Sequence, residues 1–180
     1  GTINIDDEMS EAAVENAREF VIHNQIYAGG IVAYMTGSSL TRCVSETHFT
    51  AVVTGNMFAG AIIGQAAASS DISACYADGS MNISCLTAKD EIGRPTVGYV
   101  YGYQAKSERD KLHYNAGMTI TLKKDDDETA VQSYNDVTPA AFSRALFTET
   151  MGFGTYDEQA EDHGANVWII SDSEIKLFIE

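Results

Sequence analysis

The sequence predicts a mainly β protein built from antiparallel strands with two short helices, and an α+β arrangement is the alternative. An aromatic residue, Ala-Gly and an apolar run recur at 27–32, at 58–63 and, with one inserted residue, at 114–120. Glycine ends a strand and permits a positive φ, and the β-branched residues after it favour a new strand. A second observation is the alternation of apolar and small residues over 96–103, which indicates a half-buried strand. One face of that strand would carry Val97, Tyr99, Tyr101 and Tyr103.

Two segments carry helix signals. Ser10 can cap a helix over 11–19, a stretch that is rich in helix formers and acidic in its first turn. Thr138 as N-cap and Pro139 as first helical residue predict a second helix through 140–150. Both helices are short, so strands are expected to dominate the fold.

The remaining elements are expected to be strands joined into local hairpins, because turn residues separate them. Asp78-Gly79 is a strong hairpin dipeptide and is expected to join Ala74–Ala77 to Met81–Cys85. The other expected strands are 31–35 paired with 40–44, 49–53 followed by 57–63, 118–123, and 167–170 paired with 175–179 around Asp172.

The domain organisation is expected to be simple. The chain has 180 residues, which fits one domain with an arm, and it contains no Pro-rich tract or other linker. We expect residues 1–25 to form an N-terminal arm with the short helix and residues 26–180 to form a single β-rich domain. A domain of this size buries about 70% of its unfolded surface, so it needs no metal or disulfide to hold a core.

The net charge of the chain limits the classes of partner that it can bind. Asp and Glu number 26 against 11 Lys and Arg, for a formal net charge of −15. Such a surface repels phosphate backbones and anionic membranes, so we expect no nucleic acid and no membrane as a partner. The uncharged stretch 49–70 is long enough to span a bilayer, but its Thr, Gln, Ser, Ala and Gly content favours a buried strand and loop.

The three cysteines allow two interpretations. Cys75 and Cys85 flank the expected turn at Asp78-Gly79, so their sulfurs could meet and form a disulfide in an oxidising compartment. Alternatively, Cys43 and these two are small buried or half-buried thiols. The odd count argues against a full disulfide framework.

No set of residues in the sequence has the pattern of a catalytic, cofactor or metal site. The four histidines lack metal-ligand spacing, and Cys43 with His48 lies in no thiol-protease motif. The acidic run Asp125–Glu128 lacks the spaced oxygens and the glycine of a calcium loop, and the acidic stretch 157–163 is expected to be an exposed surface. We therefore predict a protein that is not an enzyme and has no cofactor. The tyrosines of 96–103 are either an aromatic binding platform or the half-buried face of a strand.

The stretch 26–39 resembles the opening hairpin of tailed-phage head decoration, or capsid cementing, proteins. Residues 58–62 are similar to a second segment of that family, and 114–122 and 166–169 have the same style. The resemblance implies a β-barrel-like or sandwich-like subunit, usually a homo-trimer, that stabilises a capsid lattice at the virion surface. Its partner would be the major capsid protein. Residues 2–8 would act as the arm that joins a capsid strand.

The sequence is also compatible with two other functions. One is a pilin-like extracellular subunit, with an N-terminal helix packed on an antiparallel sheet and a Cys75–Cys85 disulfide. The other is a small hydrolase whose site the sequence does not reveal. The pilin interpretation needs the disulfide, whereas the capsid interpretation does not.

Overall fold

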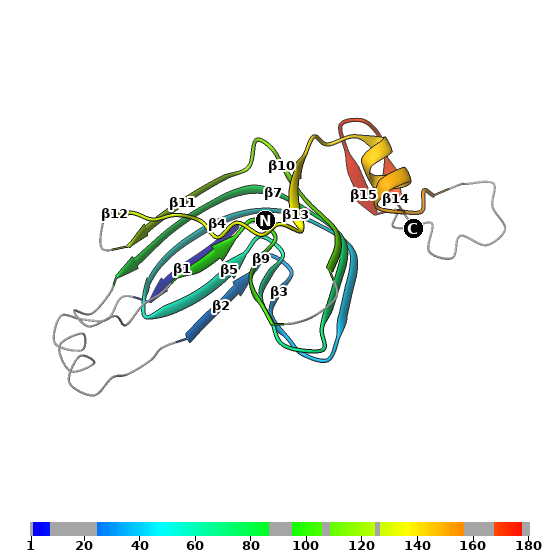
Figure 1. Cartoon of the computed structure of the whole chain (residues 1–180). Coiled ribbons are helices and arrows are strands. Elements are labelled where there is room, and N and C mark those ends of the chain that lie inside the picture. The colour runs from blue at the N-terminus through cyan, green and yellow to red at the C-terminus, as the bar shows by residue number, and fades with distance from the viewer. Residues whose placement is uncertain are drawn as a thin grey trace.

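The chain winds into parallel coils that stack on one another, as in a β-solenoid (Figure 1). The structure, a computed structural model, describes residues 2–7, 25–86, 95–105, 109–124, 127–156 and 168–177. Within them, each of the strands β2, β3 and β4 pairs in parallel with the strand three places later in the chain. A strand therefore meets its partner only after a full turn of the chain.

Three coils form the body. The first contains β2 (Gln25–Gly29), β3 (Val32–Met35) and β4 (Ser39–Thr54). The second contains β5 (Asn56–Gly60), β6 (Ile63–Ala66) and β7 (Asp71–Leu86). The third contains β8 (Thr96–Gly98), β9 (Tyr101–Gln104), β10 (Arg109–Asn115) and β11 (Thr119–Lys124).

The long strands form one curved, half-barrel sheet that wraps around the short strands (Figure 1). Its order is β1-β4-β7-β10-β13, where β1 is Thr2–Asp7 and β13 is Val137–Ala140, and β11 continues alongside β7. The strand β12 (Asp127–Glu128) pairs with the end of β11. The stacks β2-β5-β8 and β3-β6-β9 form two short parallel sheets.

The main core fills the space between the long sheet and the short ones. It is built of aliphatic, small and sulfur-containing side chains, and its most deeply buried members come from the second coil. Met57 and Ile63 on the short strands and Ile72 and Ile83 on β7 are each 0% exposed. Burial of this kind favours folding by about 25 cal/mol per Å² of apolar surface, so the second coil anchors the stack.

The repeated Ala-Gly pattern marks the solenoid repeat. Gly29, Gly60 and Gly98 lie in register at the end of β2, β5 and β8, where each coil turns toward its next strand. A Cβ on Gly60 would stand 2.5 Å from the Cα of Tyr101, so only glycine lets the two short sheets approach this closely. The copies at 27–32 and 58–63 therefore stack, whereas the copy at 114–120 lies elsewhere, because Tyr114 pairs with Ala77.

A second corner recurs on the long strands. Arg42, Ala74 and Lys111 have positive φ values of 54°, 51° and 54°. The residues that follow them are in register across the sheet, because Cys43 pairs with Cys75 and Cys75 pairs with Leu112. The same unusual backbone conformation therefore bends three neighbouring strands at one level of the coil.

The mainly β class is confirmed, but the antiparallel arrangement is wrong. The expected partners 31–35 and 40–44 fall on β3 and β4, which each pair with the next coil instead of with each other. Local turn signals predict a neighbour in sequence, whereas the in-register stack pairs residues about one coil apart. The one confirmed hairpin is terminal: β14 (Trp168–Ile170) pairs antiparallel with β15 (Ile175–Leu177).

The expected hairpin around Asp78-Gly79, and with it the Cys75–Cys85 disulfide, is wrong. β7 runs without interruption from Asp71 to Leu86, so the two cysteines are separated by ten residues of extended chain, on the order of 30 Å. Gly79 has φ +108°, and a Cβ there would stand 2.1 Å from the carbonyl oxygen of Thr47. Glycine at this position therefore allows β7 to lie close to β4 and does not form a turn.

The helix expected from Thr138 is also wrong in its extent. Thr138 and Pro139 lie in β13, which pairs with β10, and only the later residues form η1 (Leu146–Thr150), one turn of π-helix. Sheet pairing outweighs the N-cap signal there. η1 packs with β14 and β15 around Tyr76 and Phe147, in a second, smaller core. The helix expected over 11–19 lies outside the described residues.

The uncharged stretch 49–70 forms parts of β4, β5 and β6 with the turns between them. No helix in the described part of the chain is long and apolar enough to cross a membrane.

Candidate functional site

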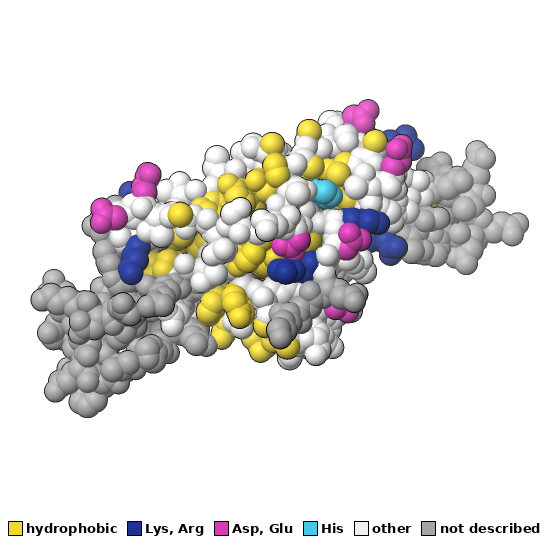
Figure 2. All heavy atoms as spheres, in the orientation of Figure 1, with side chains coloured by type: hydrophobic (Ala, Val, Ile, Leu, Met, Phe, Trp, Pro, Cys, Tyr) yellow, Lys and Arg dark blue, Asp and Glu magenta, His cyan; other side chains and the backbone are white. Residues whose placement is uncertain are grey.

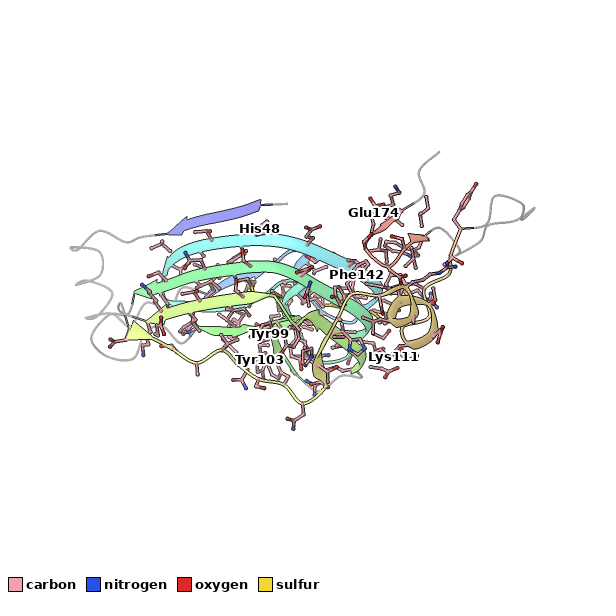
Figure 3. The ribbon with its side chains drawn as sticks, turned by 90° about the horizontal axis from the view of Figure 1, so that it is seen from above. His48, Tyr99, Tyr103, Lys111, Phe142 and Glu174 are labelled. Carbon is pink, nitrogen blue, oxygen red and sulfur yellow. The ribbon has the colours of Figure 1, made fainter. Side chains whose placement is uncertain are left out.

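The N-terminal strand β1 occupies one end of the long sheet. Its residues Thr2–Asp7 pair in parallel with His48–Val53 of β4, and no described strand covers its other side. In Figure 3 this strand runs along the border of the molecule, beside the strand that carries His48. Residues 2–7 of the predicted arm thus form the last described strand at one border of the long sheet. A sheet border is where main-chain pairing with another chain can take place.

Aromatic rings from four short strands form an exposed group, which we call the aromatic cluster and define as Tyr27, Tyr34, Phe58 and Tyr103. The rings of Tyr27 and Phe58 stack at 5.7 Å with 13° between their planes, because the two residues lie in register on β2 and β5. Tyr34 and Tyr103 flank this pair and are 47% and 41% exposed. Figure 2 shows hydrophobic side chains reaching the surface over the middle of the molecule, with charged side chains both beside them and toward the ends.

A cavity of about 560 Å³ lies where the terminal hairpin meets the long sheet. Its wall combines aromatic and aliphatic groups with four carboxylates, and none of the lining residues in the described part of the chain is Lys or Arg. Phe142 and Glu174, two of the lining residues, lie at this end of the molecule in Figure 3. Glu46, Asp78, Asn115 and Trp168 also line the cavity. The chemistry of the cavity favours a cationic group over an anionic one.

The floor of the cavity is a row of polar residues across three strands. Glu46 of β4 pairs in register with Asp78 of β7, and Asn115 lies next on β10. Two carboxylates side by side repel each other. Asp78 accepts hydrogen bonds from Asn115 Nδ2 at 2.8 Å and from the backbone N–H of Gly79 at 2.7 Å. These donors compensate the negative charge on Asp78.

A second polar network joins Tyr101 of β9, Arg109 of β10 and Asp136. Arg109 Nε lies 2.9 Å from Asp136 Oδ2, and Tyr101 Oη donates to Asp136 Oδ1 at 3.0 Å while accepting from Arg109 Nη1 at 2.6 Å. The Tyr101 side chain is fully buried, and burial together with the Asp136 charge raises its pKa. The network ties the loop before β13 to the third coil, which is a structural task.

Cys43 and Cys75 lie side by side on β4 and β7, in register. Both are thiols, Cys43 is half-buried and Cys75 is fully buried. Hydrogen bonding from Cys75 lowers the pKa of Cys43, and the same interaction together with burial raises the pKa of Cys75. Cys85 is buried away from this pair and donates to the carbonyl oxygen of Gly55 at 3.2 Å.

The structure does not bring Cys43 and His48 together. They lie five residues apart on the extended strand β4, so their side chains point to opposite faces of the sheet. His48 Nδ1 bonds instead to Ser80 Oγ at 2.9 Å, and His113 Nδ1 bonds to Thr138 Oγ1 at 2.9 Å. Burial lowers the pKa of His113. Among the described residues, no group of three or more His, Cys, Asp or Glu side chains is arranged to hold a metal ion.

The tyrosine stripe of 96–103 divides among three environments. Tyr99 stacks on Tyr114 with ring centroids 3.9 Å apart, Tyr101 is buried in the polar network, and Tyr103 joins the aromatic cluster. The chain turns between β8 and β9, so the period-two pattern does not describe one continuous strand. Of the aromatic platform, only Tyr103 is exposed at the surface.

The acidic stretches are described only in part. Asp127 and Glu128 form β12 opposite Lys124 and Lys123 of β11, which places opposite charges side by side. The preceding two aspartates and the stretch 157–163 lie outside the described residues. The acidic cavity was not predicted, because its carboxylates come from β4, β7 and the terminal hairpin.

No family model, no curated protein and no solved structure matches this chain.

Proposed function

We propose that this chain is a structural subunit that attaches to a protein lattice by pairing its N-terminal arm with a strand of the lattice. The observation that carries the proposal is the position of β1. Residues 2–7 form a strand at the border of the long sheet, held by main-chain pairing to β4 on one side. A segment that pairs in this way with its own sheet can pair in the same way with a neighbouring protein.

The setting proposed is a capsid, with the major capsid protein as partner and the virion surface as location. The resemblance of 26–39 and 58–62 to head decoration proteins supports this setting. The net charge of −15 supports a partner whose contact surface is basic, and the carboxylate-lined cavity adds a concave acidic surface at the hairpin end. The proposed role is non-catalytic and needs no cofactor.

The fold favours a rigid subunit that resists force over a flexible one. Parallel coils joined in register bury a continuous core, and the second coil is held by the first on one side and by the third on the other. Such a stack transmits force from coil to coil, because main-chain hydrogen bonds link each coil to the next. A homo-oligomer is the proposed state on the lattice, since decoration subunits repeat with the capsid symmetry.

The test uses two arm variants of equal length. In the first, Ile3 and Asn4 are both replaced by proline, which removes consecutive N–H donors and prevents strand pairing on either side. In the second, Ile3→Val and Asn4→Thr keep β-forming residues in the same places. Each protein is mixed with capsid shells assembled from the major capsid protein encoded in the same genome, and co-sedimentation is measured.

We expect the intact chain and the Val/Thr variant to bind and the double-proline variant to stay in the supernatant with an unchanged β-type circular dichroism spectrum. Equal binding by the double-proline variant would remove the arm from the proposal. Failure of the intact chain to bind these shells would remove the capsid function. The genes that flank the coding sequence give an independent check, because head and protease genes are expected there.

A further inference from the structure

We propose that Cys43 and Cys75 are a redox-controlled cross-link site that joins the first coil of the solenoid to the second by a disulfide. The inference concerns the stability of the stack and does not depend on the proposed function. It begins with the register: β4 and β7 run in parallel, and Cys43 is the direct partner of Cys75. Neighbouring strands lie about 4.8 Å apart, and disulfides bridge Cα atoms separated by about 4.4–6.8 Å.

The side chains of the two residues point to the same face of the sheet, because directly paired residues of parallel strands project together. Cys75 Sγ lies 4.0 Å from the carbonyl oxygen of Leu40 on β4, so the sulfur leans toward the strand that carries Cys43. The thiols also donate to backbone carbonyls two residues back, Cys43 to Thr41 at 3.5 Å and Cys75 to Ser73 at 3.3 Å. Both are unoxidised in this structure.

The backbone before each cysteine has an unusual shape. Arg42 and Ala74 immediately precede the two cysteines and have φ values of 54° and 51°. These matched bends place the cysteines at the same corner of successive coils. Because both strands bend alike at this level, a bond between the sulfurs joins two equivalent positions of the repeat.

The two thiols are suited to different steps of disulfide exchange. Cys43 is half-buried, and interaction with the neighbouring Cys75 side chain lowers the pKa of Cys43, which favours its thiolate. Cys75 is fully buried, so a reagent in solution reaches Cys43 first. This asymmetry assigns Cys43 as the attacking thiol and Cys75 as the resolving thiol.

The oxidant is a small disulfide such as oxidised glutathione. The Cys43 thiolate attacks one sulfur of the reagent, forms a mixed disulfide and releases one glutathione thiolate. Cys75 then loses its proton and attacks the Cys43 sulfur, which forms the Cys43–Cys75 bond and releases the second glutathione thiolate. Two protein thiols are oxidised, the reagent is reduced to two thiols, and the two protein protons pass to the released thiolates.

The experiment incubates the reduced full-length chain with oxidised glutathione and counts thiols after unfolding, followed by peptide mass spectrometry. We expect the thiol count to fall from three to one, with the mass loss of two hydrogen atoms on a peptide pair that contains Cys43 and Cys75. The melting temperature should rise by roughly 5–15 °C, because the bond closes a loop of one coil. Dithiothreitol should reverse both changes.

Three variants separate the assignment from general oxidation. Cys85→Ala keeps the pair and should fall from two thiols to none. Cys75→Ser should accumulate one glutathione adduct on Cys43, whereas Cys43→Ser should leave Cys75 unmodified in the folded chain. Peptide mapping of the unmutated protein still identifies the bonded cysteines if a variant fails to fold. Three persisting thiols under oxidising conditions, or a bond that includes Cys85 or a second chain, would overturn the proposal.

Discussion

Gly29 and Gly60 lie directly opposite each other in the parallel register of β2 and β5, at the corner where each coil turns. Neither position has room for a side chain. A Cβ on Gly29 would stand 2.2 Å from the carbonyl oxygen of Val32, and one on Gly60 would stand 2.5 Å from the Cα of Tyr101. The corner glycines thus set how closely the two short sheets approach.

Replacing Gly60 with alanine should therefore destabilise the protein by about 2–4 kcal/mol, because the added methyl group overlaps backbone atoms that cannot rotate away. Gly117→Ala is the matched control, since its Cβ would meet only Asn115 Oδ1 at 3.4 Å. Urea unfolding followed by circular dichroism measures both. Similar midpoints for the two variants would show that the corner does not depend on glycine.

The positive φ of Lys111 predicts a stabilising change. A lysine in the left-handed region costs about 1–2 kcal/mol, whereas glycine adopts it freely but loses more entropy on folding. Lys111→Gly should thus raise the free energy of unfolding by about 0.5–1 kcal/mol. The ion pair that it removes, to Asp110 at 3.9 Å, is exposed and contributes little. Lys123→Gly in β11 has no such strain to relieve and should be destabilising in the same urea titration.

Buried tyrosines predict a loss of stability at high pH. Burial, with smaller effects of nearby charges, raises the pKa of Tyr76 and of Tyr134 to about 12. An unfolded chain has tyrosine pKa values near 10. Because the folded pKa is the higher one, the stabilisation is complete below pH ~10 and is lost as the pH rises toward 12.

Chemical denaturation at pH 8, 10 and 11 should therefore show a constant midpoint at first and then a fall. Tyr76→Phe should reduce that fall, because one of the contributing hydroxyls is absent. Absorbance of tyrosinate in the folded protein gives a second measurement. Titration of every tyrosine near pH 10 in the folded state would contradict the expected burial effect.

The polar row under the cavity predicts the effect of one added charge. Asn115→Asp replaces a donor to Asp78 with a carboxylate, next to the in-register pair of Glu46 and Asp78. We expect a loss of about 1–3 kcal/mol at pH 7, from the lost hydrogen bond and the added repulsion. The repulsion raises the pKa of the new carboxyl, so stability relative to the unmutated protein should recover as the pH falls toward 4.

Asn115→Ser is the control, because it removes the amide donor without adding charge. Its loss of stability should be smaller and should not change over the same pH range. A pH-independent loss in Asn115→Asp would mean that the charges of this row do not interact. Thermal unfolding across pH 4–7 distinguishes the two outcomes.

Local patterns in the sequence determine where strands begin and end. The glycines at 29 and 60, the turn at 54–56 and the hairpin around Asp172 all lie at strand ends, because backbone freedom and β-branched side chains act within a few residues. The acidic balance and the buried apolar runs are likewise properties of the sequence. The strand-end signals and the β-branched runs establish the mainly β class, whereas the charge balance bears on partners and not on fold.

Strand partners depend on tertiary structure. Cys43 meets Cys75, and Glu46 meets Asp78, only because each coil returns to the same register after about thirty residues. A turn signal such as Asp78-Gly79 predicts a hairpin when taken alone. β7 nevertheless stays extended, because its pairing with β4, β10 and β11 provides more main-chain hydrogen bonds than a local turn would. The cavity and the thiol pair depend on that long-range pairing, so no short stretch of the sequence could reveal them.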